Sequence, residues 1–214
     1  MTRKRRTSSP LVVLAAVAAV ALIVVGSIGL WQSLSARDTA STVDMRGQAV
    51  ALDPGEAPIS AQSSRAVDDT GSRLLVPSVD LDVPLGALDA VDGQITPPGF
   101  TSAYRVRNMG VDPAQSASGT VFVVMHSLRG GAVGPGNYLI DVDRQRSTVP
   151  DGATVIVDGV TFTVTGSSLV SKNRIASEST VWANTPNRLL VITCLQNADG
   201  SPSTDNLIIT AQRS

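Results

Sequence analysis

From residue 73 onward the chain is a succession of short apolar runs, rich in β-branched residues and separated by turn signals. No stretch in this region keeps a helical period, which favours strands over helices. Two of the runs flank Asp158-Gly159, a dipeptide typical of a two-residue β-hairpin turn. About 140 residues with some eight short strands predict one all-β domain, an antiparallel barrel or sandwich. The runs are residues 74–79, 120–125, 138–140, 154–157, 160–164, 189–193 and 207–210.

The N-terminal part has a different pattern. Residues 11–30 carry no charge, and at about 1.5 Å per residue a helix of this length spans roughly 30 Å, the thickness of a bilayer's hydrocarbon core. Trp31 follows, and four basic residues precede the run, which predicts a cytoplasmic N-terminus. We therefore expect a basic cytoplasmic tail over residues 1–10 and a single-pass transmembrane anchor over residues 11–31. A cleaved signal peptide is the alternative, because Ser-Leu-Ser at 33–35 resembles a cleavage site, although signal peptides have shorter apolar runs.

Residues 32–72 are dominated by small and polar residues and contain no aromatic side chain. So little apolar surface cannot offset the entropy lost on ordering a chain. This composition predicts a flexible extracytoplasmic stalk, followed by a folded domain over residues 73–214.

Charge and composition exclude several functions. Removing the four basic residues of the N-terminal tail leaves 13 positive against 18 negative charges, and an acidic body argues against nucleic-acid binding. One cysteine and one histidine cannot supply a zinc finger or an internal disulfide. The glycine-rich residues 130–136 lack the Lys-Ser/Thr ending of a phosphate loop, and Asp141 and Asp143 lack a third nearby oxygen ligand. We expect no metal and no cofactor.

The single cysteine and the single histidine each follow an expected strand. Cys194 ends the run 189–193, and His126 ends the run 120–125. Most lone cysteines are buried structural thiols. An extracytoplasmic protein, however, rarely keeps an unpaired thiol, and a cysteine with a histidine is a familiar nucleophile and base. The spacing alone does not show that these two residues meet.

Several of these segments resemble the sortase family. Residues 121–127 (Val-Phe-Val-Val-Met-His-Ser) are similar to the strand that ends in the sortase catalytic histidine, and residues 189–194 (Leu-Leu-Val-Ile-Thr-Cys) to the strand that ends in its nucleophile. Residues 74–85 resemble the first sortase strand, and residues 136–141 with 151–153 a stretch between the two catalytic strands. The resemblance covers residues 73–212 and is nearest to the actinobacterial class E/F-like branch.

This resemblance implies a closed eight-stranded β-barrel with short helices and the activity of a membrane-anchored cysteine transpeptidase. Such enzymes cut a Leu-Pro-x-Thr-Gly-like sorting signal after Thr and join the Thr to a cell-wall amine. It implies Cys194 as the nucleophile, His126 as the acid and base, and Thr193 as a residue that positions the substrate or the Cys194 backbone. A loop between two late strands would supply apolar walls for the signal from Ile175, Val181 and Trp182. We expect a monomer.

One position departs from the family. Sortases carry an arginine near the start of the last strand, where the nearest residue here is Asn206. Three explanations stay open: Asn206 takes the role, an arginine from elsewhere (Arg174, Arg188 or Arg129) supplies it, or the protein is a weak or inactive, surface-anchored binding module. An L,D-transpeptidase is a weaker alternative, because the residues around Cys194 lack the glycine and arginine typical of that family.

Overall fold

The computed structural model describes residues 43–50 and 61–214. The expected anchor at residues 11–31 lies outside this part, and no helix within the described residues is long and apolar enough to cross a membrane. The strands are β1 (Val67–Val76), β2 (Leu81–Leu88), β3 (Ala103–Val106), β4 (Thr120–Val124), β5 (Ile140–Asp141), β6 (Arg146–Ser147), β7 (Thr154–Val157), β8 (Val160–Ser171), β9 (Arg188–Leu195) and β10 (Asp205–Arg213). The helices are η1 (Pro77–Val79), η2 (Pro113–Ser118), η3 (Pro135–Leu139), η4 (Ile175–Ser177) and α2 (Ser179–Trp182).

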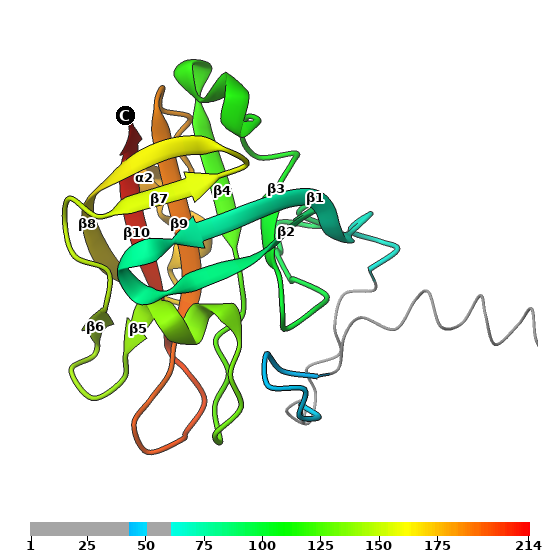
Figure 1. Ribbon diagram of the computed structural model, residues 1–214, viewed down its shortest axis with the longest axis vertical. Coiled ribbons are helices and arrows are strands. Elements are labelled where there is room, and N and C mark those ends of the chain that lie inside the picture. Colours follow the sequence, from blue (N-terminus) through cyan, green and yellow to red (C-terminus); the bar gives the residue numbers. More distant parts are fainter. Residues whose placement is uncertain (1–42, 51–60) are drawn as a thin grey trace, which may run out of the picture. The chain divides into compact units, whose positions relative to one another are not determined.

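Eight of the strands close into a barrel in the order β1-β2-β3-β4-β9-β10-β8-β7, with β7 hydrogen-bonded to β1 (Figure 1). The expected eight-stranded barrel with short helices is therefore confirmed. Strands β5 and β6 form a separate pair. Most neighbours in the barrel are antiparallel, but β2 pairs with β3 and β4 pairs with β9 in parallel. The second of these parallel pairs determines the geometry of the candidate site.

Local sequence explains where some of these elements turn. Val157 of β7 pairs with Val160 of β8 across the two-residue turn predicted at Asp158-Gly159. Both turn residues have positive φ, 50° and 73°, as a type I′ turn requires. The apolar run 138–140, expected as a strand, is mostly helix η3 instead, because Pro135 fixes φ at a helical value and starts a short helix there.

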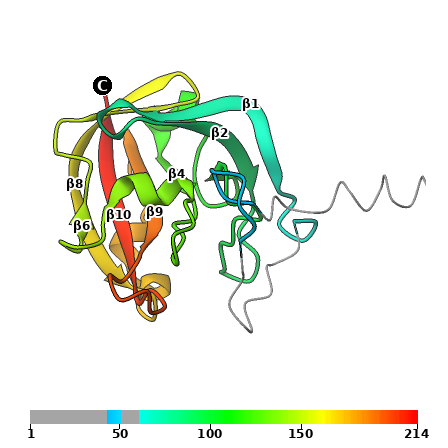
Figure 2. The same cartoon turned by 60° about the horizontal axis from the view of Figure 1, so that its bottom comes forward.

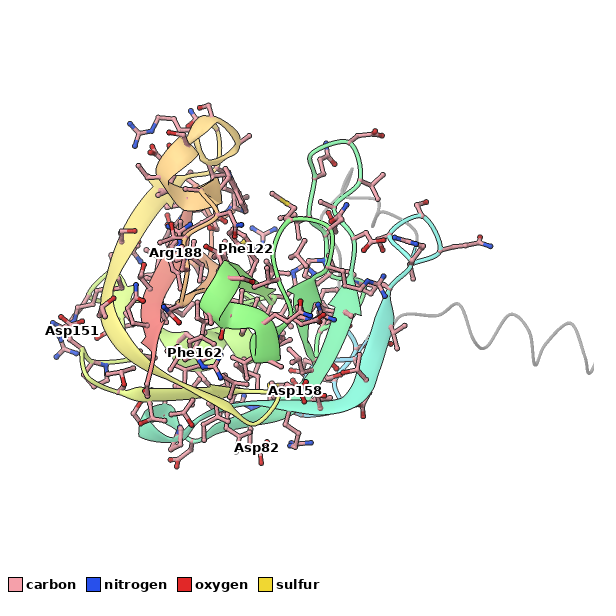
Figure 3. All side chains as sticks on the ribbon, turned by 90° about the horizontal axis from the view of Figure 1, so that it is seen from above. Asp82, Phe122, Asp151, Asp158, Phe162 and Arg188 are labelled. Atoms are coloured by element: carbon pink, nitrogen blue, oxygen red, sulfur yellow. The ribbon has the colours of Figure 1, made fainter. Side chains whose placement is uncertain are left out.

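Alternating side chains of β4, β9 and β10 supply two apolar clusters on opposite faces of the sheet. The barrel core contains Phe162, and a second cluster, here called the outer cluster, contains Phe122; Figure 3 labels both. The outer cluster is packed against side chains from the loop between β8 and β9. Its buried members are Leu88, Tyr104, Val106, Phe122, Val124, Val170, Val181, Leu190, Ile192 and Ile208.

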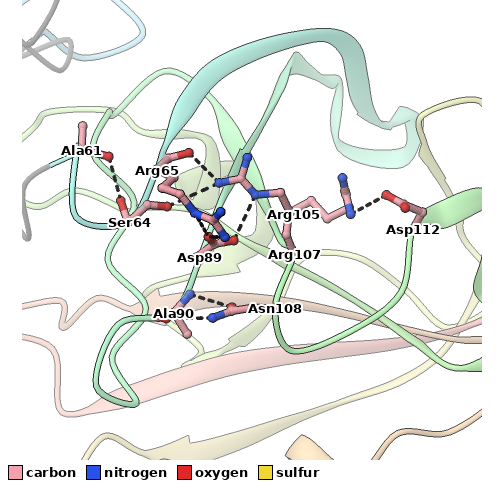
Figure 4. A network of polar contacts seen from close by, with 9 residues as sticks. All are labelled: Ala61, Ser64, Arg65, Asp89, Ala90, Arg105, Arg107, Asn108 and Asp112. Atoms are coloured by element: carbon pink, nitrogen blue, oxygen red, sulfur yellow. Dashed lines mark hydrogen bonds and ion pairs between the residues drawn. The ribbon is translucent and has the colours of Figure 1, made fainter.

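The folded part of the chain begins earlier than the sequence predicts. Strand β1 starts at Val67, six residues before the expected boundary, and its first half is exposed and paired through its backbone, so it carries no apolar period. Before it, residues 61–66 are tied to the barrel (Figure 4). The Asp89 carboxylate accepts hydrogen bonds from Arg65 Nε at 2.6 Å and Arg107 Nε at 3.0 Å. Burial alone would raise the pKa of Asp89, but these guanidinium groups outweigh it and hold the pKa below its usual range.

Candidate active site

The parallel pairing of β4 with β9 brings two strand ends together. Val124 lies opposite Ile192, and the register continues beyond the strand because Met125 N donates to Ile192 O at 3.2 Å. Two residues beyond the Val124–Ile192 pair on each chain, the same register places His126 beside Cys194. Neighbouring strands lie about 4.8 Å apart, so these residues, 68 positions apart in sequence, become neighbours in space. The loops that follow the two strands leave from the same end of the barrel (Figures 1 and 2).

The two side chains also share a face. Successive residues of a strand point to opposite sides of the sheet. Phe122 and Val124 of β4 belong to the outer cluster, so the same parity places His126 on that face. Ile192 of β9 belongs to it as well, which places Cys194 there. Both His126 and Cys194 are partly exposed, so a reacting group from solution can reach them.

Buried hydrogen bonds fix the backbones of the two strand ends to one another. Ser127 Oγ donates to Cys194 O at 2.5 Å, and Gln196 Nε2 donates to Ser127 O and Oγ at 2.8 and 2.9 Å. Sequence reasoning singled out neither Ser127 nor Gln196. In the sequence, only their positions connect them with the site: Ser127 directly follows His126, and Gln196 is two residues after Cys194. They hold the backbones of His126 and Cys194 in a fixed relative position.

Thr193 contributes to the same connection from the barrel-core face. Its hydroxyl donates to Met125 O at 3.0 Å, and the residue is 3% exposed. Of the two roles that the resemblance implies, this geometry fits the positioning of the Cys194 backbone, because the side chain points away from the outer cluster. The packing is tight here: a Cβ on Gly136 would lie 2.0 Å from Thr193 Oγ1, so only glycine fits at that position.

The His126 ring is oriented by the loop between β2 and β3. Its Nε2 donates to Pro97 O at 2.9 Å, and its ring lies 5.0 Å from that of Phe100, centroid to centroid. A carbonyl oxygen can only accept, so Nε2 carries a proton. In the neutral ring the basic nitrogen is therefore Nδ1, the atom at which a proton can be gained or lost.

Asn206 lies on the other side of Cys194. It is the antiparallel partner of Cys194 in the pairing of β10 with β9. Opposed residues of antiparallel strands have Cβ atoms about 4.5–5.5 Å apart, so the amide is within reach of a group bound to the sulfur. Asn206 is partly exposed. The register of three adjacent strands thus places His126, just beyond the end of β4, and Asn206, on β10, on either side of Cys194.

The three candidate arginines lie in different places. Arg188 begins β9, six residues before Cys194 and so roughly 20 Å away along the strand, which excludes it from the site. Arg174 is exposed and directly precedes η4. Arg129 follows His126 by three residues, and its Nη1 donates to Gly200 O, in the loop after β9, at 3.2 Å. Of the three, Arg129 and Arg174 both belong to loops at the end of the barrel that carries Cys194, because β8 ends at Ser171, which pairs with Asp205, and Asp205 pairs with Leu195.

The loop between β8 and β9 contains the three residues expected to form apolar walls, Ile175, Val181 and Trp182. Trp182 Nε1 donates to Ile175 O at 2.6 Å, and the Trp182 ring lies 5.6 Å from that of Phe122. Val181 is buried in the outer cluster. These three side chains therefore pack on the same apolar face that ends at His126 and Cys194. Within the described residues, no group of three or more His, Cys, Asp or Glu side chains could hold a metal ion.

Comparison with known proteins gives the fold a family name. No protein-family model matches the sequence, and no curated protein matches it. Among solved structures, a pilus-related sortase C of Group B Streptococcus has a TM-score of 0.50 at 13% identity, over 67% of this chain and 66% of that one. Sortase A of Listeria monocytogenes has a TM-score of 0.46 at 19% identity over 67% and 86% of the two chains. A lid mutant of Corynebacterium diphtheriae sortase A has 0.47 at 15% over 72% and 73%. The chain has the sortase fold.

Proposed function

We propose that this protein is a cysteine transpeptidase of the sortase kind. The observation that carries the proposal is the in-register parallel pairing of β4 with β9, which sets His126 beside Cys194 on one face. A nucleophile and a base on neighbouring strand ends, with the base oriented by a third group, is the arrangement that covalent catalysis requires. Here the third group is the carbonyl oxygen of Pro97.

In the first step, the Cys194 sulfur attacks the carbonyl carbon of a peptide bond. The thiolate is the reactive form, so the thiol proton passes to His126 Nδ1 before or during attack. A C–S bond forms and the C–N bond breaks. The imidazolium returns its proton to the departing amine, which leaves as the C-terminal peptide. The acyl group stays on sulfur as a thioester.

In the second step, an amine attacks the thioester. A new C–N bond forms, the C–S bond breaks, and His126 Nδ1 accepts the amine proton that the thiolate or solvent later takes up. Negative charge develops on the carbonyl oxygen in both steps. The Asn206 amide, opposite Cys194, supplies a hydrogen-bond donor for that oxygen.

The substrate in this proposal is a Leu-Pro-x-Thr-Gly-like sorting signal of a secreted protein, and the acceptor is a cell-wall amine. Ile175, Val181 and Trp182 support an apolar signal, because they lie on the apolar face that leads to the two catalytic residues. A cell-membrane anchor at residues 11–31 with an extracellular barrel completes the proposal. Alkaline carbonate extraction tests the anchor: the full chain should stay in the membrane fraction.

The decisive experiment is to trap the acyl-enzyme. The full-length protein is incubated with a panel of sorting-signal peptides and digested with trypsin, which releases residues 189–213 as one peptide containing Cys194. We expect this peptide to gain the mass of the acyl half of one substrate, and the adduct to disappear when an oligoglycine or diamino-acid peptide is added. Cys194→Ala should give no adduct, and His126→Gln should slow its formation.

A second candidate function follows from Asn206, because the chain has no arginine at this position. It is a surface-anchored binding module that keeps the barrel without turnover. The same peptide panel separates the two functions. Peptide binding to the Cys194→Ala variant, with no adduct on the native chain beside a working sortase, would favour the binding module.

A further inference from the structure

Residues 43–50, which precede the barrel, lie against the loop that follows His126. Two hydrogen bonds hold them there, one between backbone groups and one to a side chain. Met45 N donates to Val133 O at 2.8 Å, and Val133 N donates to Asp44 Oδ2 at 2.9 Å. Met45 also packs against the barrel core. This part of the chain falls within the stretch expected to be a flexible stalk, and it is docked instead.

Asp44 is the centre of this contact. Its side chain is 1% exposed, and the second carboxylate oxygen, Oδ1, accepts hydrogen bonds from the backbone N–H groups of Arg46 and Gln48, both at 2.8 Å. Burial by itself would raise the pKa of Asp44, but the three N–H donors outweigh it and hold the pKa below its usual range. Asp44 is therefore a charged carboxylate, and both of its oxygens accept hydrogen bonds. Oδ1 accepts from N–H groups of its own turn, and Oδ2 accepts from Val133 N.

The loop that Asp44 binds contacts the backbone of His126. Gly136 N donates to His126 O at 2.8 Å. Gly134 lies so close that a Cβ there would be 2.6 Å from His126 O. Asn137 Oδ1 accepts from both Leu128 N and Gly134 N, at 2.7 and 2.8 Å, which closes the loop on itself. Val133, the residue bound by Asp44, directly precedes Gly134.

We propose that Asp44 is a positioning residue for His126, so that a segment upstream of the barrel belongs to the catalytic unit. The connection is short. The Asp44 carboxylate accepts a hydrogen bond from Val133 N, and Val133 directly precedes Gly134. Gly134 packs against the His126 carbonyl oxygen, and Gly136 N donates a hydrogen bond to that oxygen. The inference rests on the proposed function for its kinetic consequence only. Its structural consequence, a change in the setting of the His126 ring, holds whether or not the protein is an enzyme.

Asp44→Asn tests this role in the full-length chain. The asparagine Oδ1 keeps the bonds to Arg46 and Gln48, while its NH₂ faces Val133 N–H, donor against donor, so the variant removes the bond to the loop. We expect kcat to fall about tenfold or more with KM changed less than twofold, because misplacement of about 1 Å can cost about 10²-fold in rate. Asp69→Asn is the matched control: Asp69 Oδ1 accepts Gly71 N in the same kind of turn on exposed β1, and its activity should match the native chain.

A second readout does not depend on activity. The chain has one histidine, so ¹⁵N imidazole spectra report on His126 alone. Asp44→Asn should shift the ring signals and speed solvent exchange of the Nε2 proton, which forms the hydrogen bond to Pro97 O.

If the Asp44→Asn protein folds and both kcat and the His126 spectrum match the native chain, the positioning role is wrong. If the native chain shows no turnover but the spectrum shifts, the proposed function fails and the positioning role stands. If Asp44→Asn does not fold, Val133→Pro removes the same N–H and leaves Asp44 in place, and an unchanged His126 spectrum in that variant overturns the proposal.

Discussion

Replacing Arg188 by Met should loosen the loop between β8 and β9 without unfolding the barrel. The guanidinium of Arg188, which Figure 3 labels, donates to the carbonyl oxygens of Thr180, at 2.9 Å, Val181, at 3.1 Å, and Ala183. These hydrogen bonds connect α2 to the start of β9. A hydrogen bond from a charged group contributes about 1.5–3 kcal/mol net. Since Arg188 is only partly buried, water replaces much of that, and we expect a total loss of about 1–3 kcal/mol. Methionine keeps the apolar stem against the sheet.

Hydrogen exchange over residues 172–187 measures this effect directly. Each 1.4 kcal/mol corresponds to a factor of ten in an equilibrium, so exchange in the loop should speed up about 5- to 150-fold while the strands exchange as before. The KM for a sorting-signal peptide should rise, because the loop carries the apolar walls. Arg213→Met is the control: Arg213 ends β10 and binds Ala114 O and Ser116 Oγ of η2, so the β8–β9 loop should be unaffected. Unchanged exchange in the Arg188 variant would refute the role given to its guanidinium.

Three more variants test the site and the fold. Asn206→Ala should slow thioester formation about 10²–10³-fold in a quenched-flow mass assay, as loss of an oxyanion donor does elsewhere, and a rate within twofold of native would remove Asn206 from the mechanism. Thr193→Val leaves the buried Met125 carbonyl without its hydroxyl partner and should lower the urea-derived free energy of unfolding by about 1–3 kcal/mol; no loss would show that the bond at 3.0 Å contributes nothing. The pKa of Asp89 is lower in the folded than in the unfolded chain, so its stabilisation is complete above pH about 4 and is lost as the pH falls through the folded pKa. Unfolding midpoints of Asp89→Asn should accordingly depend less on pH below about 4 than those of the native chain, and parallel curves would contradict this.

Six of the eight barrel strands were predictable as apolar runs because they bury an apolar face, whereas none of the expected runs falls in β2 or β3. The Asp158-Gly159 turn was predictable because its two residues tolerate positive φ. The early start of β1 was not, since residues 67–71 are exposed and, in this part of the strand, only Val67 and Ser72 pair with β2, which leaves no side-chain pattern. The docking of Asp44 was equally invisible in the sequence. It depends on one carboxylate meeting an N–H group 89 residues further along the chain.

For the site, the sequence supplies the residue types and the structure supplies their proximity. Cys194 and His126 were singled out because each is the only residue of its kind and each ends a strand. Their meeting follows from the order of strands in the barrel, which no local pattern encodes. Ser127, Gln196 and Pro97 act through hydrogen bonds that join distant parts of the chain, so only the folded arrangement shows what they do.

The parallel pairing of β4 with β9 has a consequence for how this protein is made. A hairpin could assemble its two strands locally, but paired residues of β4 and β9 are 68 positions apart in sequence, and closing such a loop costs about 4 kcal/mol of chain entropy. Burial of the finished barrel offsets that cost, so a nascent or partly folded chain holds its thiol and its imidazole far apart. Any chemistry that this pair performs is therefore absent while the chain is being synthesised, and it begins only when β9 has paired with β4.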